Sequence, residues 1–288
     1  MISGAEVLAG VLVPAGAAVV LGLGARLLPA RPSAAWAGAA LLLAAGAGHA
    51  AMAFTAGQSL NPARNGFQGI FWAQAMAALV LLVPAGLWLR AGLVAVATGL
   101  GWWLAMAPLI PHSLPLSTAL PLAAILVLGT VGVGAALEAL GRRQGCSCGL
   151  SGPLLSLVCA AATITAAGSV VLGQYAGVAA AAAGGLLISW IRTGRAAPGV
   201  GWATAILLGL HAGANLLYSD LTRPAAVLIV LAPLAAWLAQ LSVLRRHPKV
   251  QVVLRLALVA AVAGGALAYT VLAGQPAALA SDPGGFAY

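Results

Sequence analysis

Long stretches without charge, separated by short turns that carry arginine, constrain the fold of this 288-residue chain more than any other feature. Only 6% of the residues are charged and 62% are hydrophobic, with a mean hydropathy of +1.06. A soluble domain carries about a quarter charged residues to cover its surface. The composition therefore predicts an all-α fold, a polytopic integral membrane helix bundle.

Ten of the apolar stretches are long enough to cross a membrane as helices, since about 20 helical residues span the hydrocarbon core of about 30 Å. A break at Gly173, Gln174 and Tyr175 is expected between the sixth and seventh, because together they would cross the bilayer twice. The predicted spans are Leu8–Leu23, Ala34–Phe54, Gln68–Trp88, Ala91–Leu109, Ser117–Ala139, Pro153–Leu172, Tyr175–Ile191, Val200–Ser219, Pro224–Val243 and Val252–Ala273.

The basic residues divide unequally between the two sides of these ten spans. Alternate loops place two, Arg64 and Arg223, on one side and eleven on the other. By the positive-inside rule the richer side is cytoplasmic, so both termini are predicted to lie outside. The basic residues of the richer side are Arg26, Arg31, Arg90, Arg142, Arg143, Arg192, Arg195, Arg245, Arg246, Lys249 and Arg255.

The same charges indicate where the protein resides. They are scattered over several loops, so membrane topology and anionic headgroups explain the pI near 10.8 better than nucleic acid does. Arginine outnumbers lysine 12 to 1, which we interpret as a sign of a GC-rich bacterial gene and a bacterial cytoplasmic (inner) membrane. The loops are too short for a folded extramembrane domain, so residues 1–288 are expected to form one transmembrane domain.

Residues 8–110 and 175–273 are similar enough to predict an internal repeat. In each, a helix is followed by a basic loop with proline, then by a tryptophan at the next helix entry and a histidine within that helix. These residues are Trp36 and His49 in the first half, and Trp202 and His211 in the second. Helices one to four would then match helices seven to ten in the same orientation.

Polar side chains within the apolar stretches are candidates for function, because polar groups at membrane depth are costly. His49 lies in the second predicted helix and Gln74 in the third. His211 lies near the middle of the eighth, with Asn215 one turn further along the same face. These four residues predict a substrate path. The alternative is that they join helices by hydrogen bonds.

A second set of residues carries metal-binding chemistry. His49 and Met52 share a helix face and would suit Cu(I), whereas two facing histidines could ligate a haem iron. Cys146 and Cys148, in an expected cytoplasmic loop, could bind a soft metal, although no second cysteine pair completes a zinc site. The candidate metal ligands are His49, His112, His211, Met52, Cys146 and Cys148.

A third set lies in the predicted outer loops and consists of Asn61, Arg64, Asp220 and Arg223. Its two arginines are the exceptions to the charge bias. The group predicts a pocket for an anion or a lipid headgroup. The alternative is a charge-neutralising pair of Asp220 with Arg223, which are one helix turn apart.

Two further patterns predict structural roles. Glu138 precedes Arg142 by four residues, which favours an ion pair at a cytoplasmic helix end. Aromatic residues near the outer helix ends, among them Phe67, Tyr175 and Tyr218, are expected to anchor the chain at the membrane interface.

Motifs for ATP hydrolysis, metalloprotease chemistry and carboxylate-driven proton pumping are missing from the sequence, which favours a protein that is not an enzyme. Its length and ten spans resemble the ten-helix permeases of the drug and metabolite transporter group. Those permeases have cytoplasmic termini and an inverted repeat, unlike this chain. We expect a small-solute permease. The alternatives are a haem- or copper-binding subunit of a membrane redox system and a non-catalytic structural subunit, in a homo-oligomer or a membrane complex.

The predicted orientation is tested by thiol labelling of intact cells. In a chain whose native cysteines are replaced, Arg64→Cys is expected to react with an impermeant reagent from outside. Arg246→Cys is expected to react only after the membrane is opened. Reaction at position 246 but not at position 64 in intact cells would show that the orientation is reversed.

Overall fold

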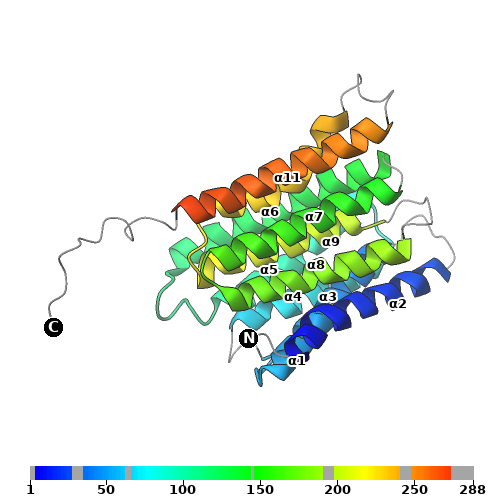
Figure 1. Ribbon diagram of the computed structural model, residues 1–288. Helices are drawn as coiled ribbons and strands as arrows, with labels where there is room; N and C mark the ends of the chain where they lie inside the picture. Colours follow the sequence, from blue (N-terminus) through cyan, green and yellow to red (C-terminus); the bar gives the residue numbers. More distant parts are fainter. Residues whose placement is uncertain are drawn as a thin grey trace.

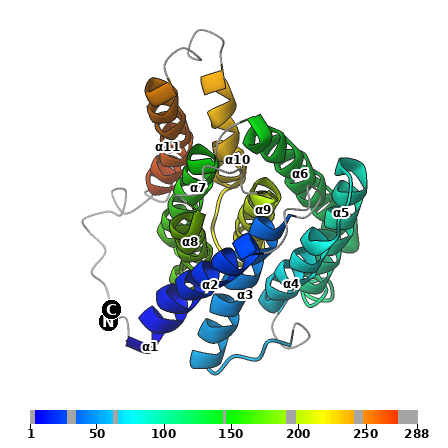
Figure 2. The same ribbon diagram turned by 90° about the vertical axis from the view of Figure 1, so that its right-hand side faces the viewer.

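The computed structural model describes residues 4–27, 35–61, 66–143, 146–190, 198–240 and 248–273. Within these ranges all regular secondary structure is helical and no strand occurs. The helices lie side by side in one bundle (Figures 1 and 2). Seven helices among the described residues are long and apolar enough to cross a membrane. The predicted all-α class and membrane bundle are confirmed at this level.

The helices follow one another through short connections. α1 (Gly4–Val7), η1 (Leu8–Leu12) and α2 (Val13–Leu27) are continuous, as are α10 (Arg223–Leu231) and η3 (Ala232–Gln240). The remaining elements are α3 (Trp36–Thr55), η2 (Gly66–Gln68), α4 (Gly69–Leu82), α5 (Leu87–Met106), α6 (Leu116–Arg143), α7 (Cys146–Ala166), α8 (Val170–Trp190), α9 (Val200–Tyr218) and α11 (Pro248–Ala273).

α9 is the central helix of the bundle. Every residue from Trp202 to Asn215 is buried, and α9 packs against helices from both ends of the chain, among them α3, α4, α6, α7 and α10. Figure 2 shows α9 enclosed by the other helices. A helix that is buried on all sides belongs to the core. A polar side chain on α9 such as His211 is therefore kept away from lipid.

Glycine lets these helices approach one another closely. A Cβ atom on Gly185 of α8 would collide with the carbonyl oxygen of Ala15 in α2. One on Gly201 of α9 would collide with the backbone nitrogen of Glu138 in α6. Small residues serve this purpose in lipid, where helix association depends on close van der Waals packing. Both pairs of helices therefore meet backbone to backbone.

Hydrogen bonds at Gly199 and the preceding residue join the helices at one end of the bundle. Gly199 has φ +84° and precedes α9. Its N–H donates to the Glu138 carboxylate, with Gly199 N 3.1 Å from Oε2, and the N–H of Gly38 donates to the carbonyl of Pro198 at 3.1 Å. A carboxylate is favourable at a helix N-terminus. The starts of α3 and α9 therefore meet the end of α6. The side chain of Arg142, the expected partner of Glu138, lies outside the described residues.

The hairpin between the sixth and seventh predicted spans was placed wrongly. Residues 173–175 lie inside α8, and the chain turns at 167–169 instead. Gly168 at that turn has φ +91°, a conformation that glycine adopts without a Cβ clash. Tyr175 therefore lies within a helix and not at a loop.

The third predicted span was also too long. α4 ends at Leu82 and α5 begins at Leu87, so Trp88 belongs to the next helix. Pro84 lies between them and lacks the N–H that a continuing helix would need. Arg90, expected in a loop, consequently lies in the first turn of α5, where it is buried.

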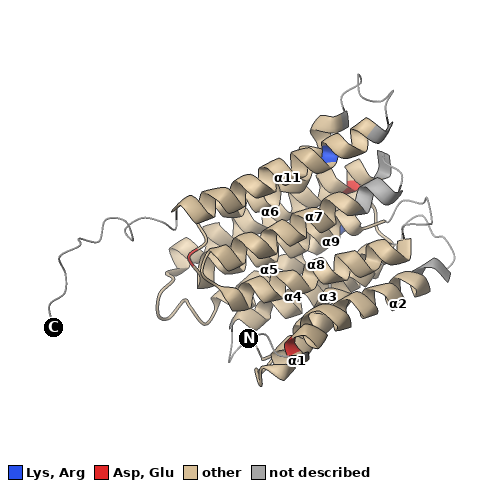
Figure 3. Cartoon of the chain, viewed as in Figure 1, with Lys and Arg blue, Asp and Glu red and all other residues tan. Residues whose placement is uncertain are grey.

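The outer surface of the bundle is apolar. Large side chains such as Phe54 and Trp88, 85% and 86% exposed, point away from the core. Figure 3 shows the charged residues toward the ends of the helices, while the middle of the bundle carries none among the described residues. This distribution matches a surface in contact with lipid, with aromatic rings near the interfaces.

The glycine contacts predict a difference between two positions of α8. Gly185→Ala is expected to lower the free energy of unfolding by about 1–3 kcal/mol, because the added methyl group forces α2 away. Gly177→Ala, where an added Cβ meets nothing within 4 Å, is expected to stay within about 0.5 kcal/mol of the wild type. Thermal unfolding in detergent measures both, and equal losses would contradict the close contact.

Candidate functional site

Aromatic rings surround His49 near the end of α3. Ring centroids lie 4.2 Å from His49 at Tyr175, 5.6 Å at Phe67 and 5.7 Å at Phe71. Phe67 also lies 5.0 Å from Tyr175 and 6.4 Å from Tyr218. These rings come from η2, α4, α8 and α9, so they join four elements to α3. We refer to His49, Gln58, Phe67, Gln68, Phe71, Tyr175 and Tyr218 as the His49 cluster.

A chain of hydrogen bonds leads from the surface to His49. The amide Nε2 of Gln68 donates to Oε1 of Gln58 at 3.4 Å, and the hydroxyl of Tyr175 donates to the same oxygen at 3.3 Å. Nε2 of His49 lies 3.0 Å from Oε1 of Gln68. Gln58 is exposed, whereas Gln68 is fully buried. Since Oε1 can only accept, we assign the proton to Nε2 of His49, which leaves Nδ1 as an acceptor.

Four buried polar atoms around this region have no hydrogen-bond partner. They are both ring nitrogens of His211, Nδ1 of His49 and Oε1 of Gln74. Each such atom costs about 1–3 kcal/mol when it is buried without a partner. The atoms come from α9, α3 and α4, and each of these helices packs against the other two. Three of the four residues predicted to line a path thus lie on helices that pack against one another.

The two histidines lie at similar levels of the bundle. α3 and α9 run in the same direction and pack together, and Gly38 of α3 contacts Gly199 at the start of α9. His49 is eleven residues beyond Gly38 and His211 is twelve residues beyond Gly199, so the two histidines lie at about the same level of the bundle.

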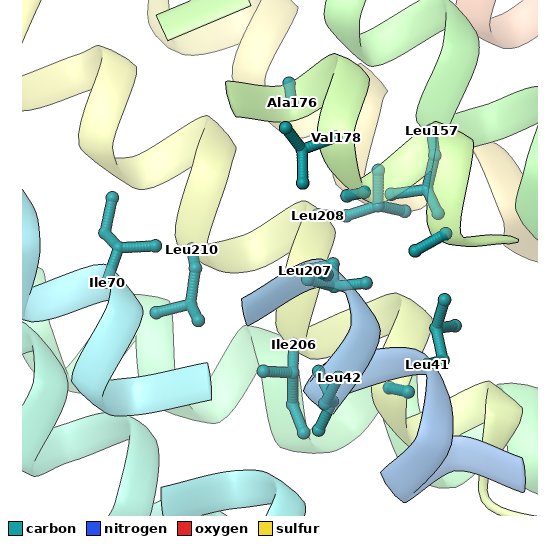
Figure 4. Packing of buried hydrophobic residues seen from close by; sticks show 14 of the residues in the cluster. Leu41, Leu42, Ile70, Leu157, Ala176, Val178, Ile206, Leu207, Leu208 and Leu210 are labelled. Atoms are coloured by element: carbon teal, nitrogen blue, oxygen red, sulfur yellow. The ribbon is translucent and has the colours of Figure 1, made fainter. Parts of the chain in front are cut away.

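Gln74 belongs to the face of α4 that meets α9. Ile70 of α4 lies beside Leu210 of α9 (Figure 4), and Gln74 is about one turn beyond Ile70 on the same face. α4 and α9 run in opposite directions, so this turn leads deeper into the bundle. Gln74 therefore lies beyond Phe71, the residue that α4 contributes to the His49 cluster.

Asn215 completes the predicted set but bonds near its own helix. Its Nδ2 donates to the carbonyl of His211 at 2.7 Å, and the hydroxyl of Ser219 donates to its Oδ1 at 3.0 Å. Tyr218 beside it donates to the carbonyl of Ala105 in α5 at 2.6 Å. A second polar chain thus leads from half-buried Ser219 to the backbone of His211.

The predicted outer polar group lies at the end of the bundle that holds the His49 cluster. Asn61 follows α3, and its N–H donates to the hydroxyl of Ser59 at 3.2 Å. Asp220 and Arg223 are exposed at the turn between α9 and α10. Arg64 lies outside the described residues. The positions of these residues therefore do not test the predicted pocket for an anion or a lipid headgroup.

Several members of the candidate metal set are placed apart. His112 is exposed in the turn between α5 and α6. Cys146 and Cys148 lie in the first turn of α7 and not in a loop, at the end of the bundle opposite the His49 cluster, and their side chains are not described. Across the described ranges, no group of three or more His, Cys, Asp or Glu residues could hold a metal ion.

The other members of the metal set lie at the His49 end. Met52 is buried, and its sulfur would lie 3.3 Å from a Cβ atom on Gly10 of η1. His49 faces the aromatic rings instead. His49 and His211 lie on α3 and α9, which pack against each other.

The members of the His49 cluster other than His49 itself were missed by the sequence analysis or given another role. Phe67 and Tyr175 were expected as interface anchors, but they are only 6% and 3% exposed. The misplaced hairpin moved Tyr175 to the membrane surface. Gln58 and Gln68 were not singled out, although a glutamine beside apolar residues, as at Gln68, is the same signal that identified Gln74.

No protein-family model, curated protein or solved structure matches the chain. Function must therefore come from the site itself. Its buried groups are imidazoles, amides and aromatic rings, which bind polar solutes by hydrogen bonds and stacking.

The hydrogen-bond chain predicts unequal roles for its two glutamines. Gln68→Leu is expected to lower the free energy of unfolding by about 1–3 kcal/mol, because it leaves Nε2 of His49 buried without a partner. Gln58→Ala is expected to cost less than about 0.5 kcal/mol, since Gln58 is exposed. Thermal unfolding of the purified variants is the measurement. A larger loss at Gln58 would contradict the chain.

Proposed function

We propose that this protein is a small-solute permease whose path begins at the His49 cluster. The observation that carries the proposal is the group of unpartnered buried atoms on His49, Gln74 and His211. A hydrogen-bond chain that starts at exposed Gln58 ends at one of these residues, His49. Polar groups held at membrane depth favour a substrate path, and transporters commonly bind their substrates between helices near the bilayer midplane.

A transport path requires a defined membrane topology. We propose that the chain crosses the membrane ten times, with both termini outside. Three apolar helices are shorter than the rest, namely Gly69–Leu82, Ser151–Ala166 and Arg223–Ala239. α7 as a whole, α4 with η2, and α10 with η3 are each about 27–32 Å long, close to the thickness of the hydrocarbon core. The bias of basic residues supports a cytoplasmic Gly199 end and an outer His49 cluster in a bacterial inner membrane.

We also propose that residues 8–110 and 175–273 are a repeat. α3 and α9, the second and eighth helices, are parallel and in contact, as helices equivalent in a same-orientation repeat can be. Gly38 bonds to Pro198 at their starts. His49 and His211 lie further along these two helices. The proposed site would then lie between matching helices of the two halves.

In the proposed permease, the packed Gly199 end of the bundle is the barrier that must open for transport. There, Gly199 is bonded to Glu138, and an added Cβ atom would collide with Ala35 of the α3 entry. Passage to the cytoplasm requires α3 and α9 to separate from α6 at this point. Alternation between two such arrangements is how permeases expose a fixed site to each side in turn.

A redox subunit that binds haem or copper is the second candidate. It is favoured by one observation, the two unpartnered ring nitrogens of His211 on a helix that packs against the helix of His49, because neutral imidazoles ligate both haem iron and copper. Metal analysis and the visible spectrum of the purified protein separate the two candidates. A permease is expected to show metal at background level and no haem absorption. One bound metal ion or haem per chain would refute the permease and favour the redox subunit.

Osmotic flux tests the permease directly. Stopped-flow light scattering of vesicles that contain the protein is expected to show faster entry than in protein-free vesicles for at least one member of a panel of small solutes. His211→Phe is expected to reduce this entry about fivefold or more, as expected for the loss of at least one hydrogen bond to the solute.

His112→Phe is the matched control, because it removes an exposed histidine from a turn outside the site. Its flux is expected to equal that of the wild type. Flux of no solute, or equal flux in the His211 variant, would refute the permease and favour a structural subunit.

A further inference from the structure

The first described segment of the chain covers the turn of α3 that carries His49. A Cβ atom on Gly10 of η1 would lie 3.3 Å from the sulfur of Met52, and one on Gly48 would lie 2.8 Å from Cβ of Pro14. The chain from Gly10 to Pro14 therefore runs along the turn of α3 that contains His49. Met52 lies on the same face of α3 as His49, toward the outer end.

The same segment also contacts α8, which contributes Tyr175 to the His49 cluster. η1 packs against both α3 and α8. The added Cβ atom on Gly48 that meets Pro14 would also lie 2.6 Å from Cγ1 of Val178 on α8, and Val178 is one turn from Tyr175. The ring centroids of His49 and Tyr175 lie 4.2 Å apart. The segment therefore lies over the seam between α3 and α8, at the level of the cluster.

The regular helix is interrupted where this segment joins α2. Pro14 has no N–H, so it cannot donate to the carbonyl of Gly10, as the residue four positions on in an α-helix would. The N–H of Val13 donates instead to the carbonyl of Leu8, five residues earlier, and η1 is a π-helix. Helices bend at prolines and at π-bulges. The chain around Pro14 is therefore where the segment can move relative to α2.

Packing is unequal on the two sides of Pro14. Beyond it, a Cβ atom on Gly185 of α8 would collide with the carbonyl oxygen of Ala15, so α2 and α8 meet backbone to backbone. Before it, η1 meets the thioether of Met52, which is a flexible side chain. Most side chains of η1 are exposed. Because lipid tails are as apolar as these side chains, the segment is held to the bundle by its few packing contacts alone.

We propose that residues 4–12 are the outer gate of the permease and swing about Pro14 to open the seam between α3 and α8. This proposal rests on the proposed function and adds the element that moves at its outer end. With the segment closed, Met52, His49 and Tyr175 are buried. Opening exposes them to the outer side. The packed opposite end of the bundle is the second barrier, and alternate opening of the two gives access to each side in turn.

A reversible cross-link tests the gate. In a chain whose native cysteines are replaced, Gly10→Cys with Met52→Cys places two thiols where these residues meet. The entry of urea, glycerol and formate into vesicles is followed by stopped-flow light scattering. Oxidation of the pair to a disulfide is expected to abolish protein-dependent entry, and a reductant is expected to restore it. Failure of the disulfide to form would contradict the contact on which the gate depends.

The matched control is a cross-link on the other side of Pro14. Gly22→Cys with Ser189→Cys joins α2 to α8 where a Cβ atom on Gly22 would lie 3.1 Å from Cβ of Ser189. Oxidation of this pair is expected to leave entry unchanged, because the gate moves while α2 stays packed on α8. Equal loss of entry with both pairs would overturn the gate, since any restraint of the first helix would then stop transport.

Thiol labelling follows the movement without a transport assay. In chains with a single cysteine, Met52→Cys is expected to react with an impermeant reagent applied outside, since opening brings water to the thiol. Ala18→Cys, fully buried on α2 beyond the hinge, is expected to stay unmodified. Equal inertness at both positions would overturn the gate.

The outcomes separate the gate from the permease. If solute enters wild-type vesicles and the cross-link between positions 10 and 52 changes nothing, the gate falls and the permease stands. If no solute enters wild-type vesicles, the permease falls, and labelling at position 52 still decides whether the segment opens.

Discussion

The backbone contacts of α9 are the interaction on which the rest of the structure depends. At its start, Gly201 meets the backbone of Glu138 in α6, and Gly199 meets Ala35 and Gly38 at the entry of α3. These contacts hold α9 inside a ring of helices, where its middle is buried away from lipid. Because helices in lipid associate by close packing, small residues at these points decide which side chains lie at the centre. His211 is buried for this reason.

Burial has different energetic consequences for the two histidines. His49 is paired through Gln68 to exposed Gln58, so its desolvation is partly offset. His211 has no partner for either ring nitrogen, and its desolvation is not offset within the protein. A fold that keeps such a group gains little stability from it. The contrast between the paired His49 and the unpaired His211 supports a binding role for His211.

Much of this arrangement could be predicted from the sequence. Uncharged stretches of membrane length required helices, and three of the polar residues within them, His49, Gln74 and His211, lie on helices that pack against one another. Tyr175 was misassigned because a positive-φ turn at Gly168 moved the hairpin by several residues. The pairing of Gln68 with His49 depends on how α4 packs against α3, and that packing cannot be derived from the periodicity of either segment.

The central claim is that His211 can be reached from the outer side through a polar path. Cysteine accessibility measures this directly, in a chain whose native cysteines are replaced. A small, hydrophilic, membrane-impermeant thiol reagent applied outside is expected to react with His211→Cys. It is expected to leave unmodified Ile188→Cys, a lipid-facing position that is 70% exposed on α8. If position 211 is as unreactive as position 188, no path leads to it from outside, and the account is contradicted.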